Sequence, residues 1–371
     1  MKKYNLLLLL MSISFAALAQ QTNYNLLIGT YTNTPAKSEG IYTYNFNTLT
    51  SSTKLKSIAK NVANPSFIAI SPDKKFAYSV NETGSTSTVS AFKYNSVNGK
   101  LTFLNKVESE GADPCYITAD NDNVIVANYS GGSLAVFKRK ADGSLNTAAL
   151  IIKHSGKSID PKGRQQSAHV HMVKFTPDRK FLICNDLGED QIYIYSYFPK
   201  SNKKTLSIKN VLKTTPGSGP RHITFSPNGK FAYLAHEFNG SITGYFYANG
   251  SLNKIQEIGT TPKEFEGRID GADIHVSADG KFLYETNRGD ANTISVFSIL
   301  STGILRFVET VSTLGKGPRN FSIDPSGKFL LVANQYTNDV VIFKRNKLTG
   351  KLTDSGKKIE VAAPVNLVFT K

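Results

Sequence analysis

The amino-acid sequence predicts an all-β fold, a seven-bladed β-propeller, and two observations carry this prediction. A short turn followed by an aromatic or aliphatic strand recurs along the chain with nearly the same letters. The fragments at the two ends of the chain complement one another as parts of one further repeat. A repeat of about fifty residues, built from strands and tight hairpins, is typical of β-propellers.

The turn motif marks the hairpin between the first two strands, A and B, of each repeat. A loop then leads to strand C and a second hairpin to strand D, and all four strands are β-branched or aromatic runs bounded by Gly, Asn and Pro. The six copies begin at Ser71, Thr118, Thr176, Ser226, Ser277 and Asp324, so successive copies lie 47 to 58 residues apart. The six complete blades start near Pro65, Pro114, Val170, Arg221, Gly271 and Pro318.

The chain ends supply the seventh blade, which comes first in the sequence. The segments Tyr24–Tyr31, Gly40–Phe46 and Lys54–Ala59 have the character of three strands, but no strand A precedes them. At the other end, Ala363–Phe369 resembles the strand A of the following blade, Asn64–Ile70, and nothing comparable follows it. Strands from both chain ends are therefore expected to close the first blade, which removes exposed sheet edges.

The first residues have the pattern of a secretory signal peptide. Lys2 and Lys3 form a basic start, an apolar run follows, and Ala17-Leu18-Ala19 fits the cleavage site. We therefore expect a signal peptide over residues 1–19, a propeller over residues 20–371, and export to the periplasm or beyond. The apolar run is too short for a membrane span, and no later run is long enough for one.

Charge and cysteine content limit the classes of partner and bond. The net charge of +16 fits an anionic ligand, an anionic surface or nucleic acid. The lysines are scattered over hairpins, as at Lys74 and Lys230, so we interpret them as solubilising residues and expect no nucleic-acid partner. Cys115 and Cys184 fall in different repeats, which favours buried free thiols over a disulfide.

Position within a repeat predicts position around the ring axis. Antiparallel pairing puts the start of strand A and the end of strand B at the same rim, and strand A is innermost, so both positions line the channel mouth. The recurrent Asn at the end of strand B is expected to stabilise the turn. The starts of strand A are Ser66, Cys115, His171, Arg221, Ala272 and Arg319; the ends of strand B are Asn81-Glu82, Asn128-Tyr129, Asp186-Leu187, His236-Glu237, Asn287-Arg288 and Asn334-Gln335.

Four mouth positions depart from the pattern toward ionisable residues: His171, Arg221, Glu237 and Arg288. Arginines around a narrow mouth are costly unless they face an anion or a carboxylate, and Glu237 can neutralise only one. The excess predicts a site for an anionic ligand, the structural alternative being an ion pair that only staples neighbouring blades. Strand alternation predicts that His222 points away from this site and packs between blades.

Metal and serine chemistry are not favoured. His169-Val170-His171 offers two ligands, and Glu237 or Asp186 could add a third, but a zinc site needs three or four convergent ligands. No Gly-rich phosphate loop precedes a helix, and the candidate serines lie in hairpins. We therefore predict no metal ion and no serine nucleophile.

Several motifs at these positions resemble those of a known family. They are His169-Val170-His171, Gly219-Pro220-Arg221-His222, His236-Glu237-Phe238-Asn239-Gly240, Ala272-Asp273-Ile274-His275 and Asn287-Arg288, joined by Ile28-Gly29-Thr30-Tyr31-Thr32 and Ala127-Asn128-Tyr129-Ser130-Gly131-Gly132. From Asn25 to Phe369 the chain resembles the lactonase family, seven-bladed propellers of the 6-phosphogluconolactonase and carboxymuconate cyclase types. The resemblance implies an active site made of His171, Arg221, Glu237 and Arg288, with His169 beside it and no cofactor.

The expected activity is hydrolysis of a small anionic sugar lactone. Arg221 and Arg288 would hold the anionic group and stabilise the oxyanion, and either His171 or Glu237 would be the general base. The arginines should lower the pKa of the carboxylate, which favours histidine as the group that titrates near neutral pH. Further substrate contacts are expected from His169, Arg319, Asn128 and Gln335.

Two other functions remain open at this point. A lactone-forming cycloisomerase would use the same groups to move a proton while an arginine binds a carboxylate. A propeller without catalysis would use the mouth only to bind a ligand or a protein. Because phosphorylated sugar lactones are cytosolic and this chain has an export signal, the identity of the lactone is also open.

Overall fold

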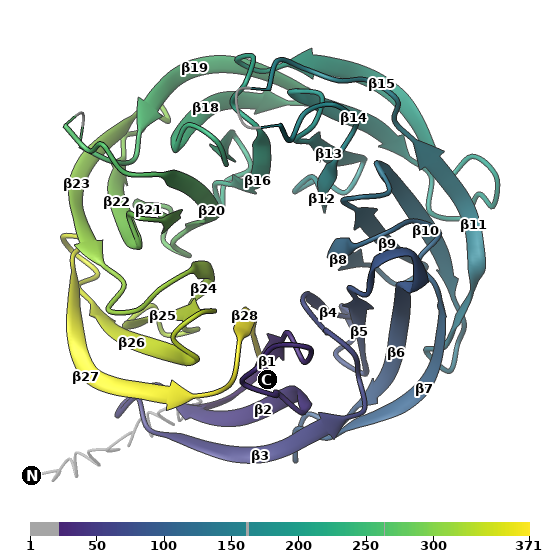
Figure 1. The fold of residues 1–371 in the computed structure, drawn as a ribbon, viewed down its shortest axis with the longest axis horizontal. Helices are drawn as coiled ribbons and strands as arrows, with labels where there is room; N and C mark the ends of the chain where they lie inside the picture. Colours follow the sequence, from purple (N-terminus) through teal and green to yellow (C-terminus); the bar gives the residue numbers. More distant parts are fainter. Residues whose placement is uncertain (1–21, 161–162, 263) are drawn as a thin grey trace, which may run out of the picture.

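The computed structural model describes residues 22–160, 163–262 and 264–371, which form seven four-stranded antiparallel sheets around a central axis (Figure 1). Helical structure within these ranges is limited to one 3-10 turn, η1 (Gly84–Thr86). The predicted all-β, seven-bladed propeller is confirmed. The predicted signal peptide, residues 1–19, lies outside the described residues.

Each blade has four strands, which follow one another from the ring axis to the outer wall. The first blade contains β28 (Pro364–Thr370), β1 (Asn23–Thr30), β2 (Gly40–Asn47) and β3 (Thr53–Lys60); the second contains β4 (Ile68–Ile70), β5 (Phe76–Asn81), β6 (Thr88–Tyr94) and β7 (Leu101–Glu108). The third contains β8 (Pro114–Ala119), β9 (Asn123–Asn128), β10 (Ser133–Arg139) and β11 (Leu145–Lys153); the fourth contains β12 (Val170–Phe175), β13 (Phe181–Asp186), β14 (Gln191–Tyr197) and β15 (Leu206–Lys213). The fifth contains β16 (Pro220–Phe225), β17 (Phe231–His236), β18 (Ser241–Ala248) and β19 (Ser251–Gly259); the sixth contains β20 (Ile269–Val276), β21 (Phe282–Gly289), β22 (Thr293–Ile299) and β23 (Leu305–Ser312). The seventh contains β24 (Pro318–Ile323), β25 (Phe329–Asn334), β26 (Asp339–Arg345) and β27 (Leu352–Glu360).

The two ends of the chain meet in the first blade, as predicted. Strand β28, from the C-terminus, is the innermost strand and pairs with β1 from the N-terminal side, so that Leu27 faces Val368 and Gly29 faces Asn366. In Figure 1 the yellow end of the chain therefore lies beside the purple beginning. This pairing covers the inner edge of β1, which would otherwise be open.

The recurrent turn motif has a physical basis in one hydroxyl group. Ser226 donates its hydroxyl hydrogen to Oδ1 of Asn228 at 2.7 Å and accepts the backbone N–H of Phe231 at 2.9 Å. A hydroxyl residue followed by a short acid or amide two positions later therefore closes the A–B hairpin. The same two bonds recur in the turns that begin at Ser71, Thr176 and Ser277.

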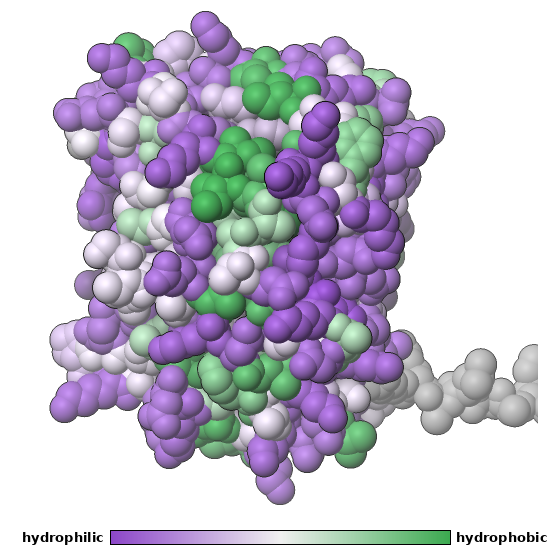
Figure 2. Space-filling view, turned by 90° about the vertical axis from the view of Figure 1, so that its right-hand side faces the viewer, coloured by the Kyte–Doolittle hydropathy of each residue, from purple (hydrophilic) through white to green (hydrophobic). Residues whose placement is uncertain are grey.

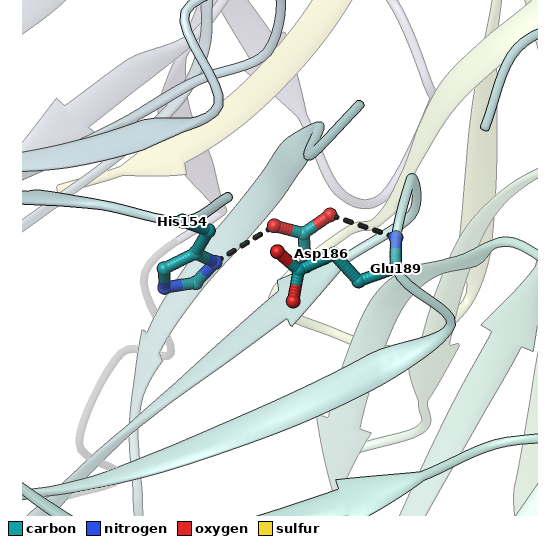
Figure 3. Close-up of side chains that lie close together, drawn as sticks. All are labelled: His154, Asp186 and Glu189. Atoms are coloured by element: carbon teal, nitrogen blue, oxygen red, sulfur yellow. Dashed lines mark hydrogen bonds and ion pairs between the residues drawn. The ribbon is translucent and has the colours of Figure 1, made fainter. Parts of the chain in front are cut away.

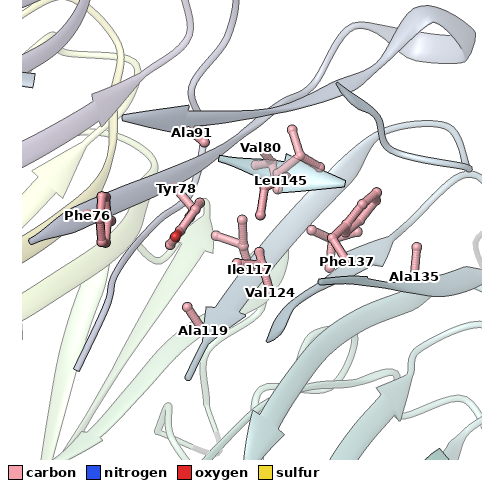
Figure 4. Packing of buried hydrophobic residues seen from close by; sticks show 12 residues of the cluster. Phe76, Tyr78, Val80, Ala91, Ile117, Ala119, Val124, Ala135, Phe137 and Leu145 are labelled. Carbon is pink, nitrogen blue, oxygen red and sulfur yellow. The ribbon is translucent and has the colours of Figure 1, made fainter. Parts of the chain in front are cut away.

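The hydrophobic core lies between the blades rather than inside any one sheet. Figure 4 shows the cluster between the second and third blades, in which Tyr78 and Val80 of β5 pack against Ile117 of β8 and Phe137 of β10. Within the described residues, corresponding clusters fill each of the other junctions around the ring, including the junction of the seventh blade with the first. Each blade thus buries both faces against its neighbours, as expected of stacked repeats.

The outer wall of the ring is mixed in polarity. On the face shown in Figure 2, apolar side chains form separate patches between polar ones. Exposed apolar residues on the outermost strands include Phe103 on β7, Ile151 on β11 and Ile208 on β15. In the described part of the chain, no helix has the length and hydropathy needed to cross a membrane.

A β-bulge at the start of the inner strand positions the site. In the fifth blade, Pro220 pairs with His236 and His222 pairs with Ala235, so Arg221 is an extra residue with no partner. An extra residue bends the strand and re-aims the side chains around it. Bulges at the same place leave Cys115, His171 and Arg319 as the extra residues of β8, β12 and β24.

Removal of the C-terminal strand should open the ring. A variant truncated after Ala362 lacks β28, so β1 loses its inner partner and the cluster between the seventh and first blades loses Leu367. We expect aggregation or loss of a single cooperative melting transition, measured by calorimetry and light scattering. Deletion of the exposed Lys371 alone is the control, and a truncated protein that melts like the full chain would contradict closure by β28.

Candidate active site

The candidate site is centred on the carboxylate of Glu237, the residue after β17. It is buried, and three guanidinium groups reach it at the channel mouth. Arg221 Nε donates to Oε2 at 2.8 Å, Arg288 Nη2 lies 3.1 Å from Oε2, and Arg164 Nη2 donates to Oε1 at 2.7 Å. We call these four residues the Glu237 cluster. It carries one negative and three positive charges, an excess of two positive charges.

Each arginine of the Glu237 cluster comes from a different element. Arg221 is the bulged residue of β16, and Arg288 belongs to β21, where it fills the position that Glu237 has in the preceding blade. Arg164 comes from the insert between β11 and β12, which the sequence analysis did not connect with the site. Its guanidinium also lies over the ring of Phe238, 4.8 Å from the centroid. In the sequence, the feature that could have indicated this role is that Arg164 is the only arginine of the insert.

The three arginines keep Glu237 ionised. Burial by itself would raise the pKa of this carboxyl group, but Arg288, Arg221 and Arg164 together hold that pKa well below its usual range. Burial, with repulsion from Arg288, lowers the pKa of Arg221 to about 10, so Arg221 still carries its charge at neutral pH. Both partners are therefore charged, and a charge buried in this way is stable only because it is paired.

Two details show how the guanidinium groups are oriented. Nη1 of Arg221 donates to the backbone carbonyl of Ala272 in the neighbouring blade, which fixes the plane of that group. Nε of Arg288 is buried and has no hydrogen-bond partner among the described residues. An unpartnered buried N–H is costly, so this atom marks a place where a ligand oxygen would be favourable.

His171, the bulged residue of β12, lies beside the Glu237 cluster. Its Nε2 is 3.8 Å from Oε2 of Glu237, and its Nδ1 is 3.8 Å from the sulfur of Cys115. Burial, together with the nearby charge of Arg221, lowers its pKa well below the usual range for histidine. The expectation that this histidine titrates near neutral pH is therefore wrong, because the imidazole is already neutral there. Cys115 and Cys184 are both free and buried, as expected.

His169 is connected to the Glu237 cluster through Tyr129. The two rings are stacked with centroids 4.5 Å apart, and Nδ1 of His169 lies 3.0 Å from the carbonyl oxygen of Tyr129. The ring of Tyr129 also contacts His171, and its hydroxyl accepts a hydrogen bond from Arg164 at 2.9 Å. Tyr129, which the sequence analysis did not select, thus connects the two histidines to Arg164.

The side chain of Asn128 has only structural contacts among the described residues, although it was predicted to contact substrate. It is fully buried, and its amide nitrogen donates to the carbonyl of Ser109 at 3.0 Å and to the hydroxyl of Ser133 at 3.1 Å. Asn334 donates in the same way to the carbonyl of Thr313. The recurrent Asn therefore ties the end of strand B to the connection that arrives from the preceding blade, which is a structural role of the kind that its repetition indicated.

His222 lies beside His171 and Arg221, so the prediction that it points away from the site is wrong, whereas it does pack between two blades as predicted. Strand alternation fails here because the bulge at Arg221 interrupts it. Its ring centroid is 5.3 Å from that of His171, and its Nδ1 is 2.8 Å from Oδ1 of Asp273. Burial, with a contribution from Arg221, lowers the pKa of His222 to about 3. The bond between His222 and Asp273 connects the fifth blade with the sixth, and Asp273 also bonds to His275 on its own strand.

Arg319 and Gln335 lie on the opposite side of the mouth. They line a pocket of about 690 Å³, together with Tyr31 and Glu82. The walls of the pocket come from the seventh, first and second blades, whereas the Glu237 cluster and His171 belong to the fourth, fifth and sixth. The residues predicted for the mouth therefore fall into two halves, one on each group of blades.

A second group of ionisable residues, His154, Asp186 and Glu189, has the composition of a metal site (Figure 3). Its potential ligand atoms lie within 4.8 Å of one another, but protein groups already occupy them. Nδ1 of His154 bonds Asp186 at 2.7 Å, Nε2 of His154 is 2.9 Å from the hydroxyl of Tyr195, and Glu189 accepts the N–H of Gly156. Oδ1 of Asp186 accepts the backbone N–H groups of His169, Gly188 and Glu189. We interpret this cluster as a hydrogen-bonded anchor that positions the backbone of His169.

Comparison with known proteins agrees with this geometry. Residues 25–369 match the family model described as Lactonase, 7-bladed beta-propeller. The chain is 35% identical over 353 residues to the 6-phosphogluconolactonase of Bacillus subtilis, and the match covers 94% of this chain and 99% of the relative. The chain belongs to the lactonase family of seven-bladed propellers.

Solved structures of this family superpose closely on the chain. A Bacteroides fragilis protein, provisionally assigned as a 6-phosphogluconolactonase, has a TM-score of 0.90 and 42% identity, with 95% of this chain and 99% of that chain covered. A Pseudomonas aeruginosa protein described as a periplasmic gluconolactonase has a TM-score of 0.89 and 35% identity, with coverages of 94% and 99%. Family members of similar identity to this chain are thus named for a phosphorylated lactone and for an unphosphorylated one. The fold alone therefore does not determine which of the two lactones this chain would take.

Proposed function

We propose that this lactonase-family protein hydrolyses a sugar lactone at the channel mouth, with the Glu237 cluster and His171 as its active site. One observation carries the proposal: three guanidinium groups converge on a single buried carboxylate beside a neutral histidine. Lactone hydrolysis builds negative charge on the carbonyl oxygen, and a fixed excess of positive charge stabilises it. The names of the Bacillus subtilis and Pseudomonas aeruginosa relatives support the same chemistry.

The lactone carbonyl oxygen is best placed near Arg288. The buried Nε of this residue has no partner among the described residues, so it can donate to the developing oxyanion without losing another bond. Arg221 contacts the same oxygen of Glu237, Oε2, as Arg288 does, so its positive charge also lies close to the oxyanion. In this arrangement the donors are held in place before the reaction begins, which is the condition for effective oxyanion stabilisation.

Between the two candidate bases, the geometry favours His171. Glu237 accepts bonds on both of its oxygens from arginines, and its pKa is well below the usual range, so it has little tendency to take a proton. His171 is neutral and has its Nε2 3.8 Å from Glu237. When His171 takes a proton, the carboxylate stabilises the imidazolium that forms.

The reaction then balances in two steps. His171 removes a proton from water while the water oxygen bonds to the lactone carbonyl carbon, and the carbonyl becomes an oxyanion beside Arg288. The tetrahedral intermediate collapses, the bond from carbon to the ring oxygen breaks, and His171 returns the proton to that oxygen. The product is an open-chain hydroxy acid, whose carboxylate remains near the arginines.

From the sequence, Arg221 and Arg288 were expected both to stabilise the oxyanion and to hold an anionic group of the substrate. In the structure Arg221, Arg288 and Arg164 are all engaged by Glu237. The oxyanion and the product carboxylate are sufficient to account for the two excess positive charges. An additional anionic group on the substrate is therefore not required by this half of the mouth.

We also propose that the protein acts outside the cytoplasm, as a mature chain that begins at Gln20. The basic start at Lys2 and Lys3, the apolar run and Ala17-Leu18-Ala19 support this proposal. The description of the Pseudomonas aeruginosa relative as periplasmic is consistent with it.

Loss of Arg221 should reduce turnover more than it reduces binding. In Arg221→Ala, we expect kcat for a sugar lactone to fall by about a hundredfold or more, because one group that stabilises the oxyanion is removed. Arg179→Gln is the matched control, since Arg179 is an exposed arginine in the A–B hairpin at the opposite rim. Wild-type kcat in a folded Arg221→Ala variant would exclude this site, and cycloisomerase activity without hydrolysis would replace the proposed reaction.

The dependence of activity on pH should reflect the low pKa of His171. Its neutral form is the active base, and burial beside Arg221 keeps it neutral below the usual histidine range. We expect kcat/KM to stay level from pH 8 to below pH 6, about the range in which an ordinary histidine titrates. The uncatalysed hydrolysis rate is subtracted at each pH. A fall in kcat/KM with a midpoint near pH 6.5 would show an ordinary histidine and contradict this environment.

Export can be tested on the native product. Mass spectrometry of protein recovered from the periplasm or the medium should find a chain that starts at Gln20. Replacing Leu7 and Leu9 by Asp should interrupt the apolar run and retain the chain in the cytoplasm. A native chain with Met1 intact in the cytosol would contradict the proposal.

A further inference from the structure

The half of the mouth that faces the Glu237 cluster has the opposite balance of charge. The pocket of about 690 Å³ contains one guanidinium group, Arg319, and two carboxylates, Glu82 and Asp113. The Glu237 cluster has two excess positive charges, whereas this pocket has one excess negative charge. The two halves therefore suit different parts of one ligand.

The charged groups of the pocket are fixed in position. The hydroxyl of Tyr31 donates to Oε2 of Glu82 at 2.8 Å, and the guanidinium of Arg319 lies over the ring of Tyr31, 5.6 Å from its centroid. Asp113 accepts the N–H of Gly84 at 2.8 Å and the hydroxyl of Ser130 at 2.6 Å. Arg319 lines the pocket, and no ion pair of its guanidinium is found among the described residues.

Further polar groups in the same walls have free hydrogen-bonding capacity. The hydroxyl oxygen of Thr34 is buried and has no partner among the described residues, and Gln335 brings an amide from the seventh blade. The pocket therefore offers carboxylate acceptors, guanidinium donors, and amide and hydroxyl groups that can do both. Such a set can bind several sugar hydroxyl groups at once. The volume is also within the usual range for small-molecule sites.

We propose, resting on the lactone hydrolysis proposed above, that the substrate is an unphosphorylated sugar lactone whose hydroxyl groups occupy the Arg319–Glu82 pocket. Its carbonyl carbon lies across the mouth at the Glu237 cluster. Sugar hydroxyl groups donate to the carboxylate of Glu82 and accept from the guanidinium of Arg319, so both charges are used without a charged ligand.

The charge balance of the pocket rejects a phosphorylated lactone. With the carbonyl at the Glu237 cluster, a terminal phosphate would enter the pocket and bring two negative charges toward Glu82 and Asp113. Arg319 alone cannot neutralise the three groups. Placing like charges together in this way is a common means of excluding a related ligand.

Binding of the two reaction products tests this proposal without requiring turnover. The probes are gluconate and 6-phosphogluconate, measured by titration calorimetry with the full folded chain. We expect gluconate to bind at least about tenfold more tightly than 6-phosphogluconate. In Glu82→Gln, which keeps an oxygen for Tyr31 but removes the charge, this preference should decrease by about tenfold. Glu108→Gln removes an exposed acid from the outermost strand of the same blade and is the matched control.

A second variant guards against a local disturbance at Glu82. Gln335→Ala changes the opposite wall of the pocket, and we expect it to weaken binding of gluconate while the melting temperature remains that of the wild type. Tighter binding of 6-phosphogluconate by the wild type, or an unchanged preference in a folded Glu82→Gln variant, would overturn the proposal.

Kinetics separate the failure of this proposal from the failure of lactone hydrolysis. Wild-type kcat/KM should be higher for glucono-1,5-lactone than for its 6-phosphate, and Glu82→Gln should change KM more than kcat. A large loss of kcat at constant KM in Glu82→Gln would place the reacting carbonyl in the pocket and overturn the proposal. If neither lactone is hydrolysed but gluconate is still preferred, the hydrolysis proposal fails and the hydroxyl-binding pocket stands.

Discussion

The carboxylate of Glu237 is the interaction on which the mouth of this propeller depends. Three guanidinium groups from three separate elements converge there, and without a carboxylate between them their mutual repulsion and loss of hydration would prevent burial. One negative charge is enough to hold the group together but not to neutralise it. In the proposed reaction the remaining positive charge stabilises the oxyanion, so the contact that holds these groups together also prepares the site for that charge.

The bulge at the start of the inner strands determines which residues reach that carboxylate. In a regular strand, Arg221 and His222 would face opposite sides, but the extra residue lets both enter the channel. The same device brings His171 and Arg319 to the mouth. Two of these bulged residues, Arg221 and His171, belong to the proposed site. The residue after Arg221, His222, connects the fifth blade with the sixth by a buried hydrogen bond to Asp273.

The division of the mouth into two halves follows from the ring itself. A lactone that becomes a hydroxy acid has one end that gains negative charge and one end that remains a neutral polyol. The fourth, fifth and sixth blades supply excess positive charge, and the seventh, first and second supply a pocket in which Arg319 is outnumbered by Glu82 and Asp113. A change of a few mouth residues would therefore be sufficient to change the substrate while the fold stays the same. This is consistent with the different lactones for which similar propellers are named.

The sequence by itself determined the seven-bladed ring, its closure by both chain ends and the common rim of His171, Arg221, Glu237, Arg288, Arg319 and Gln335, because a repeat converts position in sequence into position around an axis. The tertiary structure decided what repetition cannot encode. Arg164 enters from an insert that belongs to no repeat, and His222 turns inward because a bulge breaks the alternation. The neutral state of His171 results from burial beside Arg221, and burial depends on the assembled blades rather than on the residues next to it in the chain. Asn128 kept the structural role that its repetition indicated, since a group used in several blades serves the blade and not the site.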